Sequence, residues 1–108
     1  MDAREYTHDG IEEFFDSDLA YAAKYDALAG HVIRSDDGLS RKTRELILIA
    51  LACAEDKVDP CADHIRDALN HGATDDEVVK TIQLAGLAGS AWGIKTGSEA
   101  LKRVRNEQ

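Results

Sequence analysis

The pattern of apolar and polar positions predicts a chain built from helices. Between residues 18 and 34 the apolar side chains recur at spacings that place them on one helical face. Ser40 is the expected N-cap of a helix over 41–56, which begins RKTRE and continues as LILIALACA. Leu and Ala without turn signals favour a helix over a buried strand here. Because a helix that is apolar on every side is buried on every side, we expect it to be the central helix of a bundle or of an oligomer.

Local start and stop signals divide the rest of the chain. Asp59 as N-cap and Pro60 as first helical residue mark one helix start. Gly72 is expected in the left-handed conformation after that helix, and Thr74 and Glu77 form a capping box for the next one. The expected helices are a short first turn at 11–16, then 18–34, 41–56, 59–71, 75–88 and 90–105.

The final third contains three glycines spaced four residues apart, Gly89, Gly93 and Gly97. On one helix they would share a face and allow close approach of another backbone. The alternative is that they end and restart helices, with a turn near Gly89. Trp92 lies between them and is interpreted as a packing or interface anchor rather than as a reactive group.

Composition limits the class of partner. The 108 residues suit one domain over 1–108, and 44% are apolar, so the chain is not a disordered one. The net charge of −8 argues against nucleic acid or an anionic membrane as partner. The longest apolar run, residues 46–54, is too short to span a bilayer.

Residues 1–9 are charged and lack the apolar stretch of a signal peptide, so we expect a cytoplasmic protein. The chain contains two cysteines, Cys53 and Cys61. In a reduced compartment a thiol is more often free, catalytic or metal-bound than part of a structural disulfide.

Cys61 and His64 form the first candidate for chemistry. Near a helix start, unsatisfied N–H groups and the helix dipole favour a thiolate, and His64 lies one turn later on the same face. Asp59 and Asp63 oppose ionisation of the thiol, because nearby negative charge raises its pKa. The alternative is a small buried cysteine and a histidine bonded to a carbonyl group.

Glu45 is the second candidate, since it precedes the apolar run and is expected at the mouth of the core. A partly desolvated carboxylate has a raised pKa and can shuttle protons. The alternative is a surface ion pair with Arg41, four residues back. Cys61, His64 and Glu45 would make a three-ligand metal site, but they lack the paired spacing of structural zinc sites, so we expect no metal and no cofactor.

The chain resembles the carboxymuconolactone decarboxylase and alkylhydroperoxidase D (AhpD-like) superfamily. The resemblance lies in residues 38–93: K-x-R-E-L-I at 42–47, A-L-x-x-G at 68–72 and A-T-x-x-E at 73–77. It implies an all-α bundle of about five to six helices. It also implies a homo-oligomer, commonly a trimer or hexamer, that acts on a small-molecule substrate.

The resemblance further implies that His64 and Glu45 are the family's proton-relay residues. The two cysteines of the family's peroxidases would fall at Lys57 and Pro60, so the C-x-x-C pair is absent here. Cys61, one place away, is expected to act as a single peroxidatic thiol. Cys53 can resolve it only if the two Cα atoms come within about 7 Å.

Three functions remain open on this basis. The first is an AhpD-like oxidoreductase that reduces a hydroperoxide through Cys61, with His64 and Glu45 moving protons. The second is a decarboxylase acting on a small carboxylated lactone, anchored by the cations Arg41, Lys42 and Arg44. The third is an oligomeric scaffold without catalysis.

Overall fold

Six α-helices make up most of residues 9–108, the part of the chain that the computed structural model describes. They are α1 (Asp9–Asp16), α2 (Leu19–Ile33), α3 (Arg41–Ala54), α4 (Val58–Asn70), α5 (Asp75–Ala88) and α6 (Trp92–Glu107). The described residues contain no strand, so the expectation of an all-α fold with five to six helices is confirmed. The segment 1–8, on which the expectation about a signal peptide mainly rests, lies outside the described residues.

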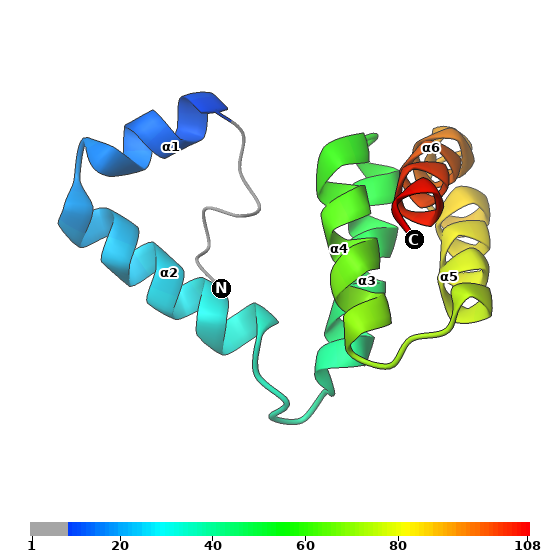
Figure 1. Ribbon diagram of the computed structural model, residues 1–108, viewed down its shortest axis with the longest axis horizontal. Coiled ribbons are helices and arrows are strands. Elements are labelled where there is room, and N and C mark those ends of the chain that lie inside the picture. The colour runs from blue at the N-terminus through cyan, green and yellow to red at the C-terminus, as the bar shows by residue number, and fades with distance from the viewer. Residues whose placement is uncertain (1–8) are drawn as a thin grey trace.

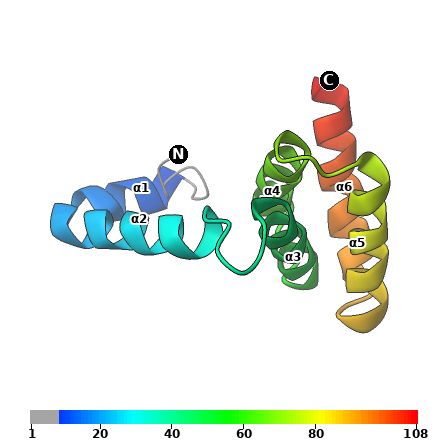
Figure 2. The same cartoon turned by 90° about the horizontal axis from the view of Figure 1, so that it is seen from below.

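The helices form two parts of unequal size. Helices α3 to α6 pack into a bundle, and α1 and α2 form a hairpin, here called the arm, that projects from one side of it (Figure 1). The view from below shows the same separation (Figure 2). The bundle core includes the fully buried Ile49 of α3, Ile65 of α4 and Val78 of α5. The two parts are joined through the 34–40 loop.

Helix α3 is central, because it packs against α4, α5 and α6. Its burial is nevertheless one-sided: Ile49 is fully buried, whereas Ile47 and Leu51 are 46% and 52% exposed. The expectation that this helix is covered on every side is therefore wrong for the single chain. Its outward face is apolar and open.

Most of the local helix signals are confirmed. Ser40 caps α3 by accepting the Thr43 N–H, and Thr74 and Glu77 form a complete capping box at the start of α5. Gly72 has a φ of +95°, the left-handed conformation expected of it. Glycine adopts this conformation without the steric cost that a Cβ atom would impose.

The expected N-cap of α4 is wrong by two residues. Lys57, not Asp59, is at the N-cap position, and it makes no side-chain capping bond. The reason is Asp56, whose φ of 59° turns the chain before the proline is reached. The carboxylate of Asp59 instead accepts a hydrogen bond from Arg103 of α6 at 2.6 Å.

The glycines combine both proposed roles. Gly89 ends α5, whereas Gly93 and Gly97 lie buried on α6. A Cβ atom at Gly97 would lie 2.5 Å from a methyl carbon of Ile82 and 3.1 Å from the sulfur of Cys53. The two α6 glycines therefore allow α6 to approach α3 and α5. Trp92 is 67% exposed, so it is not a packing anchor within the single chain.

We expect Gly97→Ala to destabilise the chain by about 1–3 kcal/mol, because the added methyl overlaps Ile82 in a packed interface. Gly30→Ala on α2 is the matched control, since its new methyl meets only the flexible end of Arg34 and gains helix propensity. Chemical denaturation followed by circular dichroism measures both. A Gly97→Ala chain as stable as the unmodified chain would show that this close approach is not needed.

Candidate functional site

Two side-chain pairs connect α3 and α4, which pack side by side. Glu45 of α3 meets His64 of α4, and Cys53 of α3 meets Cys61 of α4. The cysteine pair is nearer the connecting turn, so the two helices run antiparallel. The sequence-predicted residues on the two helices are thus brought together in two groups rather than one.

The Glu45–His64 pair is short and buried. The Nδ1 atom of His64 lies 2.8 Å from Oε2 of Glu45, and the Glu45 side chain has no solvent exposure. Arg41 donates from Nε to the other carboxylate oxygen at 3.0 Å. Glu45 therefore pairs with Arg41, as one reading expected, but this ion pair is buried rather than at the surface, and Glu45 also contacts His64. Its position is inside the core rather than at its mouth.

Asp67 completes this group and was not predicted from the sequence. Its Oδ2 atom lies 3.8 Å from the guanidinium of Arg41, and the residue is only 8% exposed. Asp67 follows His64 by three residues, so the helical period places both on one face. Arg41, Glu45, His64 and Asp67 are called the acid–base cluster below.

The acid–base cluster contains the donor set of a possible cation site. One ligand atom each of Glu45, His64 and Asp67 lies within 4.8 Å of the others, and Cys61 is not part of this group among the described residues. Carboxylate oxygens and imidazole suit a divalent ion. However, Arg41 already lies against both carboxylates and supplies their positive partner. The metal set Cys61, His64 and Glu45 is thus not assembled.

The two cysteines form the second group. Their sulfur atoms are 3.7 Å apart, both residues are fully buried, and both thiols are free. The two thiols share a hydrogen bond in which either sulfur can be the donor. This hydrogen bond raises the pKa of Cys61, and burial raises it further. The same hydrogen bond lowers the pKa of Cys53.

The expectation that the helix start favours a Cys61 thiolate is therefore wrong. Cys61 is the fourth residue of α4, and its own N–H already donates to the Lys57 carbonyl at 3.1 Å. The interaction with Cys53 and the loss of water both raise the pKa of Cys61. In this pair Cys53 is the residue whose thiolate is favoured.

The turn between the two cysteines is fixed by a contact to α6. Asp56 adopts the left-handed conformation, which aspartate tolerates better than most residues. Its carboxylate accepts a hydrogen bond from the hydroxyl of Thr96, which is fully buried on α6. The two residues are distant in sequence, and the sequence reading missed them. Together they hold the turn that brings Cys53 and Cys61 together.

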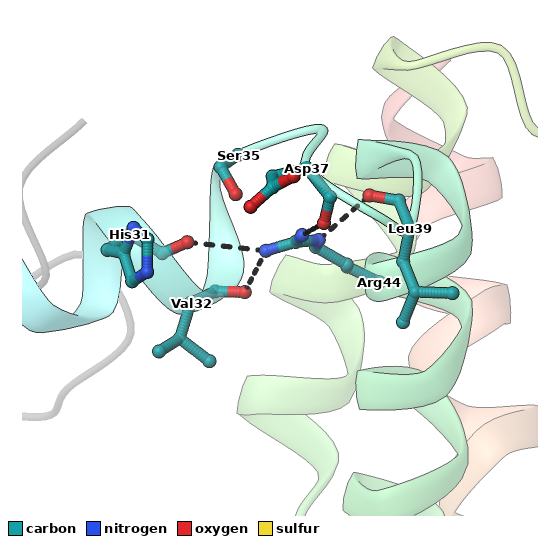
Figure 3. Close-up of a pocket in the computed structure, with 6 residues that line it drawn as sticks. All are labelled: His31, Val32, Ser35, Asp37, Leu39 and Arg44. Atoms are coloured by element: carbon teal, nitrogen blue, oxygen red, sulfur yellow. Dashed lines mark hydrogen bonds between the residues drawn. The ribbon is translucent and has the colours of Figure 1, made fainter.

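The three cations proposed as a substrate anchor are engaged within the chain. Arg41 belongs to the acid–base cluster, and Lys42 lies 3.2 Å from a carboxylate oxygen of Glu77. Arg44 donates to main-chain carbonyl groups at the end of α2 and in the following loop: Leu39 at 2.9 Å, Val32 at 2.5 Å, His31 at 3.3 Å, and Asp37 (Figure 3). Arg44 thus connects α3 to the end of α2 and to the loop that follows it.

A pocket of about 330 Å³ lies beside Arg44. Its lining consists of His31, Val32, Ser35, Asp37, Leu39 and Arg44 (Figure 3). Neither the cysteine pair nor the acid–base cluster contributes to it. The pocket is therefore a feature of the arm–bundle junction and not the entrance to the buried groups.

The described residues thus form a small helical protein with a dithiol and a buried acid–base pair on adjacent helices. The model of the carboxymuconolactone decarboxylase family matches residues 20–101, and the chain belongs to that family. The chain is also similar to the crystal structure of the apo form of a carboxymuconolactone decarboxylase family protein from Legionella pneumophila. The two share 25% sequence identity and a TM-score of 0.78, over 90% of this chain and 86% of that one.

No curated protein matches the chain at a significant level. Within residues 9–108, none of the helices has the length and apolar character needed to cross a membrane. The comparisons therefore give the family and its fold, and the chemistry rests on the geometry of the two buried groups.

We expect Cys61→Ala to raise the pKa of Cys53, because Cys53 loses its hydrogen-bond donor while it stays buried. Cys61→Ser is the matched control, since its hydroxyl can still donate and should keep the pKa of Cys53 lower than in Cys61→Ala. Titration of the thiolate by ultraviolet absorbance measures both variants. Identical titrations would show that a hydrogen bond from residue 61 does not lower the pKa of Cys53.

Proposed function

We propose that the chain is a thiol-dependent oxidoreductase that reduces a small hydroperoxide through Cys53 and Cys61. The observation that carries this proposal is the 3.7 Å separation of the two sulfur atoms. A disulfide needs a sulfur–sulfur distance of about 2.05 Å, so the pair must close by less than about 2 Å. A dithiol spread over two helices would replace the C-x-x-C pair that the sequence lacks.

The pKa directions support Cys53 as the attacking thiolate. Its sulfur attacks one peroxide oxygen, a sulfur–oxygen bond forms, and the oxygen–oxygen bond breaks to release an alkoxide or hydroxide, which takes up a proton. The Cys61 thiol then attacks the Cys53 sulfenic acid, which forms the disulfide and releases water. An external thiol reductant returns both cysteines to thiols. This order reverses the one expected from the sequence, in which Cys61 attacks and Cys53 resolves.

The acid–base cluster is suited to the proton steps. His64 lies one helical turn after Cys61, and the Glu45 carboxylate holds its Nδ1 atom and orients the ring. A histidine held by a buried carboxylate can give a proton to the leaving oxygen and regain one afterwards. Arg41 forms ion pairs with the carboxylates of both Glu45 and Asp67.

Mass mapping after treatment with hydrogen peroxide tests the proposal. We expect a Cys53–Cys61 disulfide in the unmodified chain, a trappable sulfenic acid on Cys53 in Cys61→Ser, and a slower reaction in Cys53→Ser. Because both thiols are fully buried, hydrogen peroxide should react faster than a bulky aryl hydroperoxide. Thiols that stay reduced while free cysteine in the same tube is oxidised would refute the peroxidase function.

We expect Glu45→Gln to slow peroxide reduction on the order of 100-fold, because the histidine loses its negative partner while the shape is kept. Glu99→Gln removes an exposed carboxylate from α6 and should leave the rate unchanged. Stopped-flow peroxide consumption with a dithiol reductant compares the two. Equal rates would assign Glu45 a structural role only.

One observation favours a second candidate, a decarboxylase or lactone-handling enzyme. The acid–base cluster is assembled without either cysteine, so it can serve an acid–base reaction by itself. Against this candidate, the three expected anchor cations are already engaged within the chain. Turnover of a small carboxylated lactone by Cys53→Ala/Cys61→Ala, lost in His64→Ala, would favour it. Inactivity of the unmodified chain in both assays would favour the oligomeric scaffold.

A further inference from the structure

The pocket of about 330 Å³ at the arm–bundle junction, here called the junction pocket, takes no part in the proposed reaction. Residues from the end of α2, from the following loop and from the first turn of α3 line it (Figure 3). Ligand pockets in proteins have volumes of about 300–1,000 Å³, so the junction pocket has the size for one small molecule. The side chains around it indicate the chemical class of that molecule.

Arg44 gives the junction pocket a positive charge that no carboxylate neutralises. Its guanidinium donates to four main-chain carbonyl oxygens, one through Nε, two through Nη1 and one through Nη2. A guanidinium has five N–H groups, so one N–H on Nη2 is still available. The four carbonyl partners are neutral, and within residues 9–108 Arg44 forms no ion pair. Its charge can therefore attract an anionic group in the pocket.

Asp37 gives the same pocket a negative charge that is also unpaired. Its main-chain carbonyl oxygen accepts a hydrogen bond from Arg44, whereas its carboxylate contacts no hydrogen-bond or ion-pair partner in the described part of the chain. Two opposite charges thus line one pocket without neutralising each other. A ligand that carries both a carboxylate and an ammonium group can place each group against its counter-charge.

Ser35 supplies a hydroxyl group that lacks a partner. Among the described residues, its Oγ atom is the one buried side-chain polar atom without a hydrogen bond. Buried polar atoms are nearly always hydrogen-bonded, so an exception in the wall of a pocket indicates a missing polar partner. Rotation about the Cα–Cβ bond can turn this hydroxyl towards a group in the pocket.

The polar and apolar groups of the pocket are separated in space. In the view of Figure 3, Ser35 and Asp37 lie above the Arg44 guanidinium. The side chains of Val32 and Leu39 lie below it and are 56% and 49% exposed. A ligand with a charged head and a short apolar side chain matches this division, because the apolar part would cover these two side chains.

We propose that the junction pocket binds a small α-amino acid with an apolar side chain. The ligand carboxylate would meet the remaining N–H of Arg44 and the Ser35 hydroxyl, and the ligand ammonium would meet Asp37. A purely anionic ligand is opposed by the net charge of −8, and a purely cationic ligand is opposed by Arg44. The proposal is independent of the peroxidase function, because it uses neither the cysteine pair nor the acid–base cluster.

Calorimetric titration of the full chain with leucine and two analogues tests the ligand class. Isocaproate is leucine without the ammonium group, and isoamylamine is leucine without the carboxylate. We expect leucine to bind about tenfold more tightly than either analogue, because each analogue loses one charge-assisted contact. Glycine should also bind more weakly than leucine, since it lacks the apolar side chain.

Two substitutions test the assigned contacts. Asp37→Asn should weaken leucine binding by about tenfold and should not weaken isocaproate binding, because only leucine has an ammonium group. Ser35→Ala should weaken both ligands, since both have a carboxylate. Asp76→Asn is the matched control for Asp37→Asn, because it removes an exposed carboxylate from α5, outside the pocket. Circular dichroism checks that each variant keeps its helices.

Three results would overturn the proposal. They are no binding of leucine, equal binding of leucine and either analogue, and leucine binding that Asp37→Asn leaves unchanged. Peroxide reduction by Asp37→Asn and Ser35→Ala should equal that of the unmodified chain, so this measurement keeps the amino-acid site and the peroxidase function apart.

Discussion

The packing of α3 against α4 depends on the complete burial of the Glu45 carboxylate. A buried charge needs close partners, and leaving one unpaired typically costs about 3–5 kcal/mol. Here the partners are Arg41, one turn back on α3, and His64, on α4. Because His64 comes from the other helix, this requirement fixes the register between α3 and α4. Once that register is set, the sulfur atoms of Cys53 and Cys61 lie 3.7 Å apart, close to the turn that joins the two helices.

Small residues on α6 then determine how closely the cysteine pair is enclosed. Gly93 and Gly97 allow the backbone of α6 to approach Cys53, and Thr96 between them reaches the turn through Asp56. The sulfur pair is thus held between three helices rather than displayed at a helix start. Enclosure excludes water, which raises the pKa of a lone thiol, whereas the partner thiol lowers that of Cys53. The same packing therefore sets both the reactivity of the pair and its restricted access.

Features with a local cause could be predicted from the sequence. The bounds of α5 and the Thr74–Glu77 capping box agree because the signals lie within a few residues of the structure that they specify. The start of α4 was misplaced because a left-handed Asp56 depends on Thr96, distant in sequence. Glu45 and His64 were candidates from their positions in the sequence, and the family resemblance joined them as relay residues, whereas Asp67 was not predicted. Arg44 was expected to anchor a substrate, but it binds main-chain carbonyl groups of α2 and the following loop. Such main-chain partners cannot be recognised from the pattern of side chains in the sequence.

The two faces of α3 differ in what surrounds them. Its inward face carries Glu45 and Cys53, which are fully buried, and its outward face carries Ile47 and Leu51, which are about half exposed. The junction pocket includes neither cysteine and no member of the acid–base cluster. The groups proposed to carry the chemistry therefore all lie on the side of α3 that faces the other helices of the bundle, so a hydroperoxide must pass between packed helices to reach the sulfur pair. This is the physical reason to expect the proposed reaction to favour small hydroperoxides.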